Sequence, residues 1–321
     1  MVVKSTSENS TIFSEQRALM GYMTFLYYAH WEHLLEIFRK LCQMVFLMLE
    51  LCPRSFFKSF LLFTFFTQKQ TSPTQVCRVN SSPKIQELEN SNSQANTDIT
   101  LDIHTGNLLE GIQDEQLLVK MLEDELSGNL SPRKDAGDRT IYTTRYFRES
   151  VGSLYLCDLG EAVVGNENVG PAMPTQYRAP EVILGMRWGH AIDMWSIGMM
   201  AWDMMQPADI FKIHSYEDEF LNNAYHLASM IALLGPPPRE FLKRSQESSK
   251  YWDESGNWRG IVQIPTNRTL EDLATQPQNK EERDLFINFV SGLLCWLPED
   301  RLHSFQVFSH LWIYRAMEQN Q

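Results

Sequence analysis

Residues Gln176 to Met204 read QYRAPEVILGMRWGHAIDMWSIGMMAWDM, and this stretch decides the fold. Its second half, continued to residue 205, is a nearly unbroken apolar run, AIDMWSIGMMAWDMM. A helix that is apolar on every face is a buried one, so residues 191–205 predict the central helix of a core.

The elements predicted on either side are mostly helical. NNAYHLASMIALLG (222–235) is amphipathic and stops at a glycine followed by three prolines, a strong helix end. ERDLFINFVSGLLCWL (282–297) predicts another helix, ended by Pro298, and LLVKMLEDEL (117–126) predicts a short acidic helix. SLYLCDLGEA (153–162) predicts a strand that breaks at its glycine.

Aspartate and asparagine residues that could serve catalysis lie on or next to the loops between the predicted elements. Asp102 and Asn107 are five residues apart on a loop, where one carboxylate can reach a nucleophile and one amide oxygen a metal ion. Asp158 follows an apolar strand that would hold its carboxylate in place. Taken singly these patterns are weak, because a lone Asp102 is usually a turn residue and a lone Asp193 usually a helix cap.

The order and spacing of five stretches are far more specific than any single motif. They are DIHTGNLLEGI, SPRKDAGDRTIYTTR, LCDLGEA, the 176–204 stretch quoted above, and HLASMIALLGPPPREFL. Together they resemble the C-terminal half of a eukaryotic protein kinase, and more closely the SR-protein kinase family and its fungal relatives, over about residues 99–316. The resemblance implies an α+β, protein kinase-like fold, present mainly as the helical C-terminal lobe.

The resemblance implies a catalytic role for three residues. Asp102 stands at the catalytic-loop aspartate, which accepts the proton of the substrate hydroxyl. Asn107 stands at the asparagine that holds Mg²⁺, and Asp158 at the aspartate of the D-F-G motif, the main metal ligand, with Leu159 in place of Phe. The expected cofactors are therefore ATP and Mg²⁺.

Three further residues have structural roles by the same resemblance. Glu181 is expected to form a buried ion pair with Arg301, which joins the substrate-side loop to the last helices. Asp193 is expected to brace the backbone of the catalytic loop. The chain departs from the family at His104, where most kinases have a Lys, since a neutral imidazole would stabilise the transferred phosphoryl group less well.

The nucleotide anchor of a kinase is missing from this sequence. There is no G-x-G-x-x-G motif, no V-A-I-K motif, and no ATP-anchoring lysine was found. The start, MVVKS, resembles the family stretch that begins at that lysine, with Met1 in its place, so we expect the chain to begin just after the anchor. Two functions therefore stay open. One is an ATP-dependent serine/threonine kinase that phosphorylates Ser in Arg/Ser-rich proteins. The other is a truncated kinase-fold pseudoenzyme that acts as a protein-binding module.

The amino-acid composition divides the chain into three regions. Residues 1–68 are an atypical apolar segment, either a remnant of the small lobe or the product of a mistaken exon choice in the gene. Residues 69–98 are Ser-, Asn- and Gln-rich and predict a polar linker. Residues 99–316 predict the C-terminal lobe, with an insertion at about 110–150. The acidic residues of this insertion could dock an Arg-rich substrate or simply form a solvated helix.

Charge and cysteine usage limit the partners. The net charge is −12, with nine basic and seven acidic residues before position 96 and 19 basic and 33 acidic residues after it. An acidic C-terminal portion argues against direct nucleic-acid binding and suits a basic protein partner. Five cysteines without a C-x-x-C pair indicate reduced thiols, and hence a cytoplasmic or nuclear protein. Charges interrupt the apolar stretch 41–68, so we expect no membrane helix; we also expect a monomer.

Overall fold

The computed structural model describes residues 99–110, 116–128, 133–142, 154–165, 167–215, 217–266 and 268–318. The chain divides into two compact units, residues 106–158 and the remainder. Each unit is described by itself. The predictions made for 1–68 and 69–98 lie outside the described residues.

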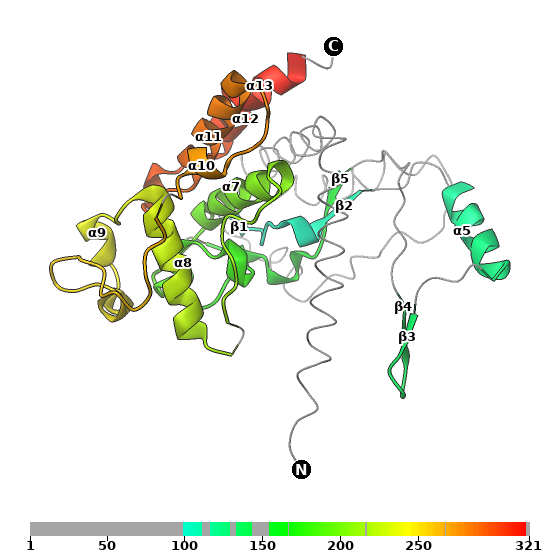
Figure 1. Cartoon of the computed structure of the whole chain (residues 1–321), viewed down its shortest axis with the longest axis horizontal. Helices are drawn as coiled ribbons and strands as arrows, with labels where there is room; N and C mark the ends of the chain where they lie inside the picture. Colours follow the sequence, from blue (N-terminus) through cyan, green and yellow to red (C-terminus); the bar gives the residue numbers. More distant parts are fainter. Residues whose placement is uncertain are drawn as a thin grey trace, which may run out of the picture. The chain divides into compact units, whose positions relative to one another are not determined.

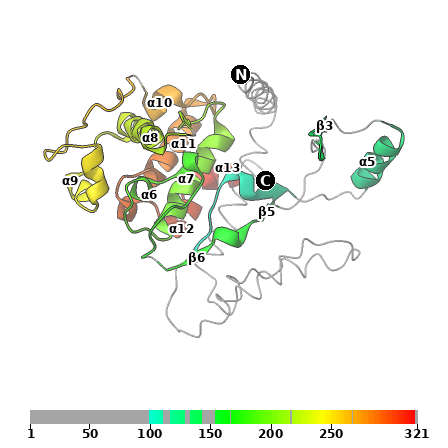
Figure 2. The ribbon, with the colours of Figure 1, turned by 90° about the horizontal axis from the view of Figure 1, so that it is seen from below.

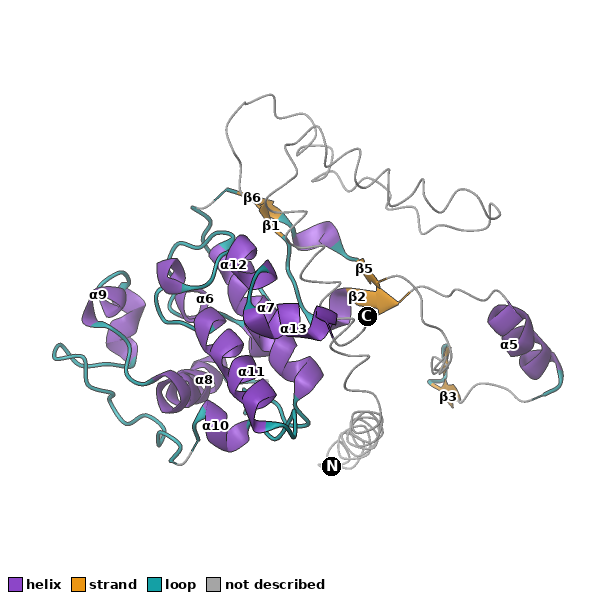
Figure 3. Cartoon of the chain, turned by 90° about the horizontal axis from the view of Figure 1, so that it is seen from above, coloured by secondary structure: helices purple, strands orange, loops and turns teal. Residues whose placement is uncertain are grey.

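The core of the larger unit is α7, Ala191–Met205, the helix predicted over those residues. Every residue from Ile192 to Trp202 is buried, as a helix with apolar side chains on all faces must be. Helix α11, Lys280–Leu293, packs along α7 (Figures 1 and 3). The two backbones approach closely at Gly198, where a Cβ atom would lie 2.9 Å from the Cβ of Leu293.

Helix α8, Glu219–Leu234, begins three residues before its predicted start. Asp218 caps its N-terminus by accepting a hydrogen bond from the Leu221 N–H at 2.9 Å. At the other end the helix stops where predicted, at Gly235, whose φ of +76° suits a residue without a Cβ.

The prediction that α11 runs to residue 297 is wrong, because the helix ends at Leu293. The next residues leave the helix and turn the ring of Trp296 into the core, where its indole N–H donates to the carbonyl oxygen of Gly235 at 3.0 Å. Gly292 lies at this end, and a Cβ atom there would be 2.8 Å from Cδ1 of Leu302. Asn279 caps the start of the helix by accepting from the Glu281 N–H at 2.8 Å.

Shorter elements complete the larger unit, and α9 lies at its periphery (Figures 1 and 2). Strand β1, Ile99–Thr100, pairs antiparallel with β6, Val163–Val164. The other elements are η2 (Leu159–Glu161), η3 (Thr175–Tyr177), α6 (Pro180–Ile183), α9 (Arg239–Leu242), η4 (Gln246–Lys250), α10 (Leu270–Leu273), η5 (Pro298–Asp300), α12 (Ser304–Phe308) and α13 (Leu311–Glu318).

Among its described residues, the smaller unit has two separate strand pairs, one α-helix and most of the 3-10 helix η1, Thr105–Asn107. Strand β2, Leu108–Glu110, pairs antiparallel with β5, Leu154–Leu156, and β3, Arg133–Asp135, pairs with β4, Thr140–Tyr142. The predicted acidic helix is present as α5, Gln116–Leu126. The strand predicted over 153–162 is wrong in length, since β5 ends at Leu156 and Asp158 has a φ of +55°, which an extended strand does not adopt.

In the part of the chain that the structure describes, no helix combines the length and the apolar character that a membrane crossing requires.

Candidate active site

Asp102 lies on a loop directly after β1. Its neighbours Leu101 and Ile103 are buried in the larger unit, so the loop is anchored on both sides of the carboxylate. The Asp102 backbone has a φ of +51°, a conformation that costs a residue other than glycine on the order of 1–3 kcal/mol. Such strain persists only where the surroundings hold it, and it is common at catalytic sites.

The carboxylate of Asp193 braces this loop from α7. It accepts the Leu101 N–H at 2.9 Å with Oδ2 and at 3.2 Å with Oδ1. Asp193 is buried, and this burial raises the pKa of its carboxyl well above the usual range, while the Leu101 N–H opposes the increase. Asp193 thus makes the kind of contact that the resemblance implies, because it accepts the N–H of the residue directly before Asp102.

Two side chains stand close to Asp102 and Thr105 in the same unit. His104 places its Nε2 atom 3.8 Å from Oδ2 of Asp102, and its ring centroid lies 6.0 Å from that of Tyr177. The hydroxyl of Tyr177 lies 3.4 Å from Oγ1 of Thr105. The segment that contains Tyr177 therefore packs against the loop that carries the candidate base.

Asn107 and Asp158 come together in the smaller unit at the same end of the β2–β5 pair. The first paired residues are Leu108 and Leu156, and the Cys157 N–H extends the ladder by donating to the Asn107 carbonyl oxygen at 2.8 Å. Asn107 is buried and Asp158 is exposed. A carboxylate and an amide oxygen on adjacent strand ends suit Mg²⁺, which prefers oxygen ligands. That Asp102 shares one site with these two residues stays a prediction.

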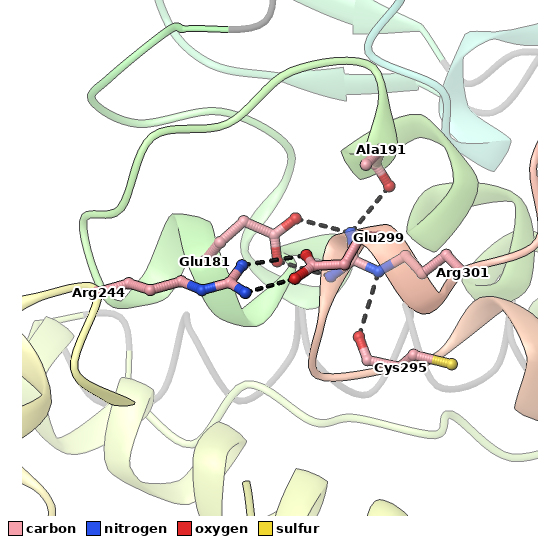
Figure 4. A network of polar contacts seen from close by, with 6 residues as sticks. All are labelled: Glu181, Ala191, Arg244, Cys295, Glu299 and Arg301. Carbon is pink, nitrogen blue, oxygen red and sulfur yellow. Dashed lines mark hydrogen bonds and ion pairs between the residues drawn. The ribbon is translucent and has the colours of Figure 1, made fainter. Parts of the chain in front are cut away.

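Glu181 and Arg301 form a bidentate ion pair in the larger unit (Figure 4). The two N–O distances are 2.7 and 2.6 Å, and each side chain is 1% exposed. The guanidinium also donates to the carbonyl oxygens of Ala191 at 2.8 Å and Cys295 at 3.2 Å, and its carbon lies 5.2 Å from the Trp195 ring centroid. This buried pair, with its two further hydrogen bonds to backbone carbonyl oxygens, ties α6 to the start of α7 and to the loop before η5.

The sequence analysis did not identify the contact between Tyr177 and Asp203. The Tyr177 hydroxyl donates to Oδ2 of Asp203 at 2.5 Å. Burial, with a smaller contribution from the charge of Asp209, raises the pKa of the Asp203 carboxyl to about 7. Burial also raises the pKa of Tyr177 strongly. The available signal was Asp203 itself, the second of two carboxylates inside the apolar 191–205 run, because a buried carboxylate requires a hydrogen-bonding partner.

This arrangement is that of a protein kinase C-terminal lobe, with a strained Asp loop, a buried aspartate that braces it, and a Glu–Arg pair that closes the lobe. Residues 147–313, just over half of the chain, match the protein kinase domain family. The chain belongs to the protein kinase family.

Curated relatives are serine/threonine kinases of several eukaryotes. A serine/threonine protein kinase of Aspergillus fumigatus is 37% identical over 188 residues, which cover 57% of this chain and 47% of the relative. The serine/threonine-protein kinase SRPK of Physarum polycephalum is 33% identical over 149 residues, 46% of this chain and 35% of the relative. Probable serine/threonine-protein kinase sky1 of Dictyostelium discoideum is 33% identical over 162 residues, 49% and 24% respectively. The matched regions span about a quarter to half of the length of these relatives.

Proposed function

We propose that this chain is part of an ATP-dependent serine/threonine protein kinase similar to SR-protein kinases, which phosphorylates Ser in Arg/Ser-rich proteins. The observation that carries the proposal is the bracing of Leu101 by Asp193, which supports Asp102 in an unfavourable backbone conformation. A loop that served only as a connection would need neither the strain nor a buried carboxylate beneath it.

The roles of the residues follow from this geometry. Asp102 would accept the proton of the substrate hydroxyl, and Asn107 with Asp158 would hold Mg²⁺, as the chemistry of their oxygen atoms allows. When bound, Mg²⁺ supplies positive charge that neutralises the phosphate oxygens during transfer. Asp193 keeps the Asp102 backbone in place, and His104, 3.8 Å from Asp102, occupies the position of the usual lysine.

The proposed substrates are basic. The portion of the chain after residue 95 has 33 acidic and 19 basic residues, which favours an Arg-rich partner over nucleic acid. The names of the Physarum and Dictyostelium relatives point to the SR-protein kinase group. We also propose that the protein works as a monomer in the cytoplasm or the nucleus, since its five cysteines suit a reducing compartment.

A second candidate is a protein-binding module without phosphoryl transfer. It is favoured by one observation, the lack of a glycine-rich loop and of a V-A-I-K lysine anywhere in the 321 residues. In a kinase these parts hold the phosphates in position, and positioning accounts for most of the catalysis. Titration of the chain with ATP and Mg²⁺ by calorimetry separates the two candidates, because only the kinase requires nucleotide.

The decisive experiment is phosphate transfer to an Arg-Ser repeat peptide, compared between Asp102→Asn and Glu254→Gln. Asparagine tolerates a positive φ, so Asp102→Asn removes the base without adding backbone strain. We expect kcat to fall by about 10²–10⁴-fold, the usual contribution of a general base. Glu254 is exposed, and its change should leave kcat unaltered.

Two results would contradict the kinase proposal. One is equal transfer by Asp102→Asn and Glu254→Gln, which would show that Asp102 is not the base. The other is tight binding of the peptide with no transfer above background, which would favour the binding module.

A further inference from the structure

Between Asp158 and the YRAPE motif, the described residues from Gly165 to Pro174 form no helix or strand and are exposed or partly exposed. The segment bends at Gly165 and Gly170, whose φ angles are +100° and +97°, and Val169 between them is 69% exposed. No Ser, Thr or Tyr occurs from residue 159 to residue 174. No phosphate can therefore be attached at these positions, and contacts with the rest of the larger unit hold the segment.

Trp188 supplies three of those contacts. Its backbone N–H donates to the Asn168 carbonyl oxygen at 2.9 Å, and its carbonyl oxygen accepts the Asn168 N–H at 3.0 Å, which makes an isolated antiparallel bridge. Its indole N–H donates to the carbonyl oxygen of Gly170 at 3.0 Å. The Trp188 side chain is buried, and its indole hydrogen bond to Gly170 is partly shielded from water.

Both sides of this connection are supported further. On the segment, the Asn168 side chain donates through Nδ2 to the Gly165 carbonyl oxygen at 2.6 Å and closes the bend. On the other side, the Met186 N–H donates to the Glu181 carbonyl oxygen at 2.8 Å, two residues before Trp188. Glu181 is itself held by Arg301. Trp188 thus links this segment to the buried Glu181–Arg301 ion pair.

The ion pair next to Trp188 contributes little to holding the segment in place. Arg187 pairs with Glu167, but their side chains are 69% and 74% exposed. Pairs as exposed as this contribute little, because water and salt screen them and both side chains lose entropy on pairing.

We propose that Trp188 is a positioning residue that holds residues 167–170 in the conformation that receives the substrate peptide, without phosphorylation. The proposal rests on the proposed function for the nature of the peptide. The segment leads through Pro174 into the turn at Tyr177, which packs against the loop of the candidate base. Loosening it would therefore weaken peptide binding before it affected the reacting groups.

The test compares Trp188→Phe with Trp258→Phe in the full chain. Phenylalanine keeps a large ring and the backbone bridge but removes the indole N–H. Trp258 is a matched control, because it also forms an isolated backbone bridge, with Trp252, and donates its indole N–H to the Val262 carbonyl oxygen at 2.9 Å. The measurements are hydrogen–deuterium exchange over residues 165–173 and the Kd of an Arg-Ser repeat peptide.

We expect Trp188→Phe to speed exchange in this segment about fivefold, the factor that corresponds to one ordinary hydrogen bond. The peptide Kd should rise by a similar factor, with the affinity for nucleotide unchanged. Trp258→Phe should alter neither quantity. A role in general stability would instead make the two variants alike.

Equal exchange in Trp188→Phe and Trp258→Phe would overturn the proposal, as would faster exchange with an unchanged peptide Kd. Both measurements work without phosphate transfer. A parent chain that binds the peptide but transfers no phosphate would therefore contradict the proposed kinase activity alone, and the two variants would still decide the role of Trp188.

Discussion

Replacing Glu181 by Gln should destabilise the larger unit more than any change of a single surface charge. The substitution preserves the volume of the side chain and removes its charge, leaving the Arg301 guanidinium buried without a counter-ion. Both side chains are 1% exposed, so water cannot solvate the remaining charge. Removing one partner of such a pair costs about 3–5 kcal/mol.

This loss is large beside the stability of a domain, usually about 5–15 kcal/mol. For a unit of roughly 150–250 residues, each kcal/mol shifts Tm by about 2–4 °C, so Tm should fall by about 6–20 °C. The guanidinium keeps its bonds to the carbonyl oxygens of Ala191 and Cys295, so the lobe should still fold, with a lower unfolding midpoint. Thermal unfolding followed by near-UV circular dichroism measures the shift.

The chain contains a matched control for this experiment, visible in the same region (Figure 4). Glu299 pairs with Arg244, and one N–O distance is 3.0 Å, but these side chains are 54% and 38% exposed. The same Glu→Gln change at Glu299 should cost less than about 1 kcal/mol. Replacing Glu181 by Leu together with Arg301 by Met should recover part of the loss, because no charge is then left buried.

Two outcomes would refute the reasoning. If the Tm values of Glu181→Gln and Glu299→Gln fell equally, burial would not be the source of the cost. If the double replacement were as unstable as Glu181→Gln, removing the unpaired charge would bring no gain, and the charge would not be the source of the cost.

Three other predictions concern the larger unit. The pKa of Asp203 is about 7 in the folded chain and 3.8 in the unfolded one, so between these pH values the folded state binds a proton that the unfolded state has lost. The free energy of unfolding should therefore fall by up to about 4 kcal/mol as pH rises from about 4 to 7. Urea titrations should show that Asp203→Asn abolishes this fall. Gly198→Ala should lower the urea midpoint more than Gly292→Ala, because a Cβ at Gly198 meets the Cβ of Leu293, which the backbone fixes, whereas one at Gly292 meets the Cδ1 and Cγ atoms of Leu302, which side-chain rotation can move; equal midpoints would contradict this. Activity should not require phosphorylation of residues 159–173, so phosphatase treatment should leave kcat unchanged, whereas a strong rise on phosphorylation of Thr175 would be the contrary result.

Much of the helical lobe could be predicted from local pattern. The 191–205 run predicts α7 to the residue, because an apolar helix interior and its ends are both encoded locally. The observed start of α8 and the observed end of α11 differ from the predicted ones, because in each case one side chain decides where the helix begins or ends. Asp218 starts α8 early, and the burial of Trp296 ends α11 before the proline that was expected to end it. Such choices depend on tertiary contacts that periodicity does not contain.

The residues of the candidate site could be predicted where they belong to sequence motifs that follow one another in a fixed order. Asp102, Asn107 and Asp158 could be named by resemblance, and the structure adds the positive φ of the two aspartates, which no motif specifies. The contacts of Asp203 and Trp188 were not predictable, because each joins residues about 20 positions apart through geometry alone. Long-range hydrogen bonds of single side chains leave no period in a sequence.

One helix carries most of the polar contacts that shape this site. Asp193 braces the backbone before Asp102, Asp203 accepts from Tyr177, and the carbonyl oxygen of Ala191 accepts from Arg301. All three acceptors belong to α7, whose other side chains are nearly all apolar and buried. The packing of its apolar side chains fixes α7 in the core, and the three acceptors on α7 hold the surrounding loops in place by hydrogen bonds. Loss of one acceptor should therefore displace a loop while the core persists, which is why activity and stability need to be measured separately in each variant.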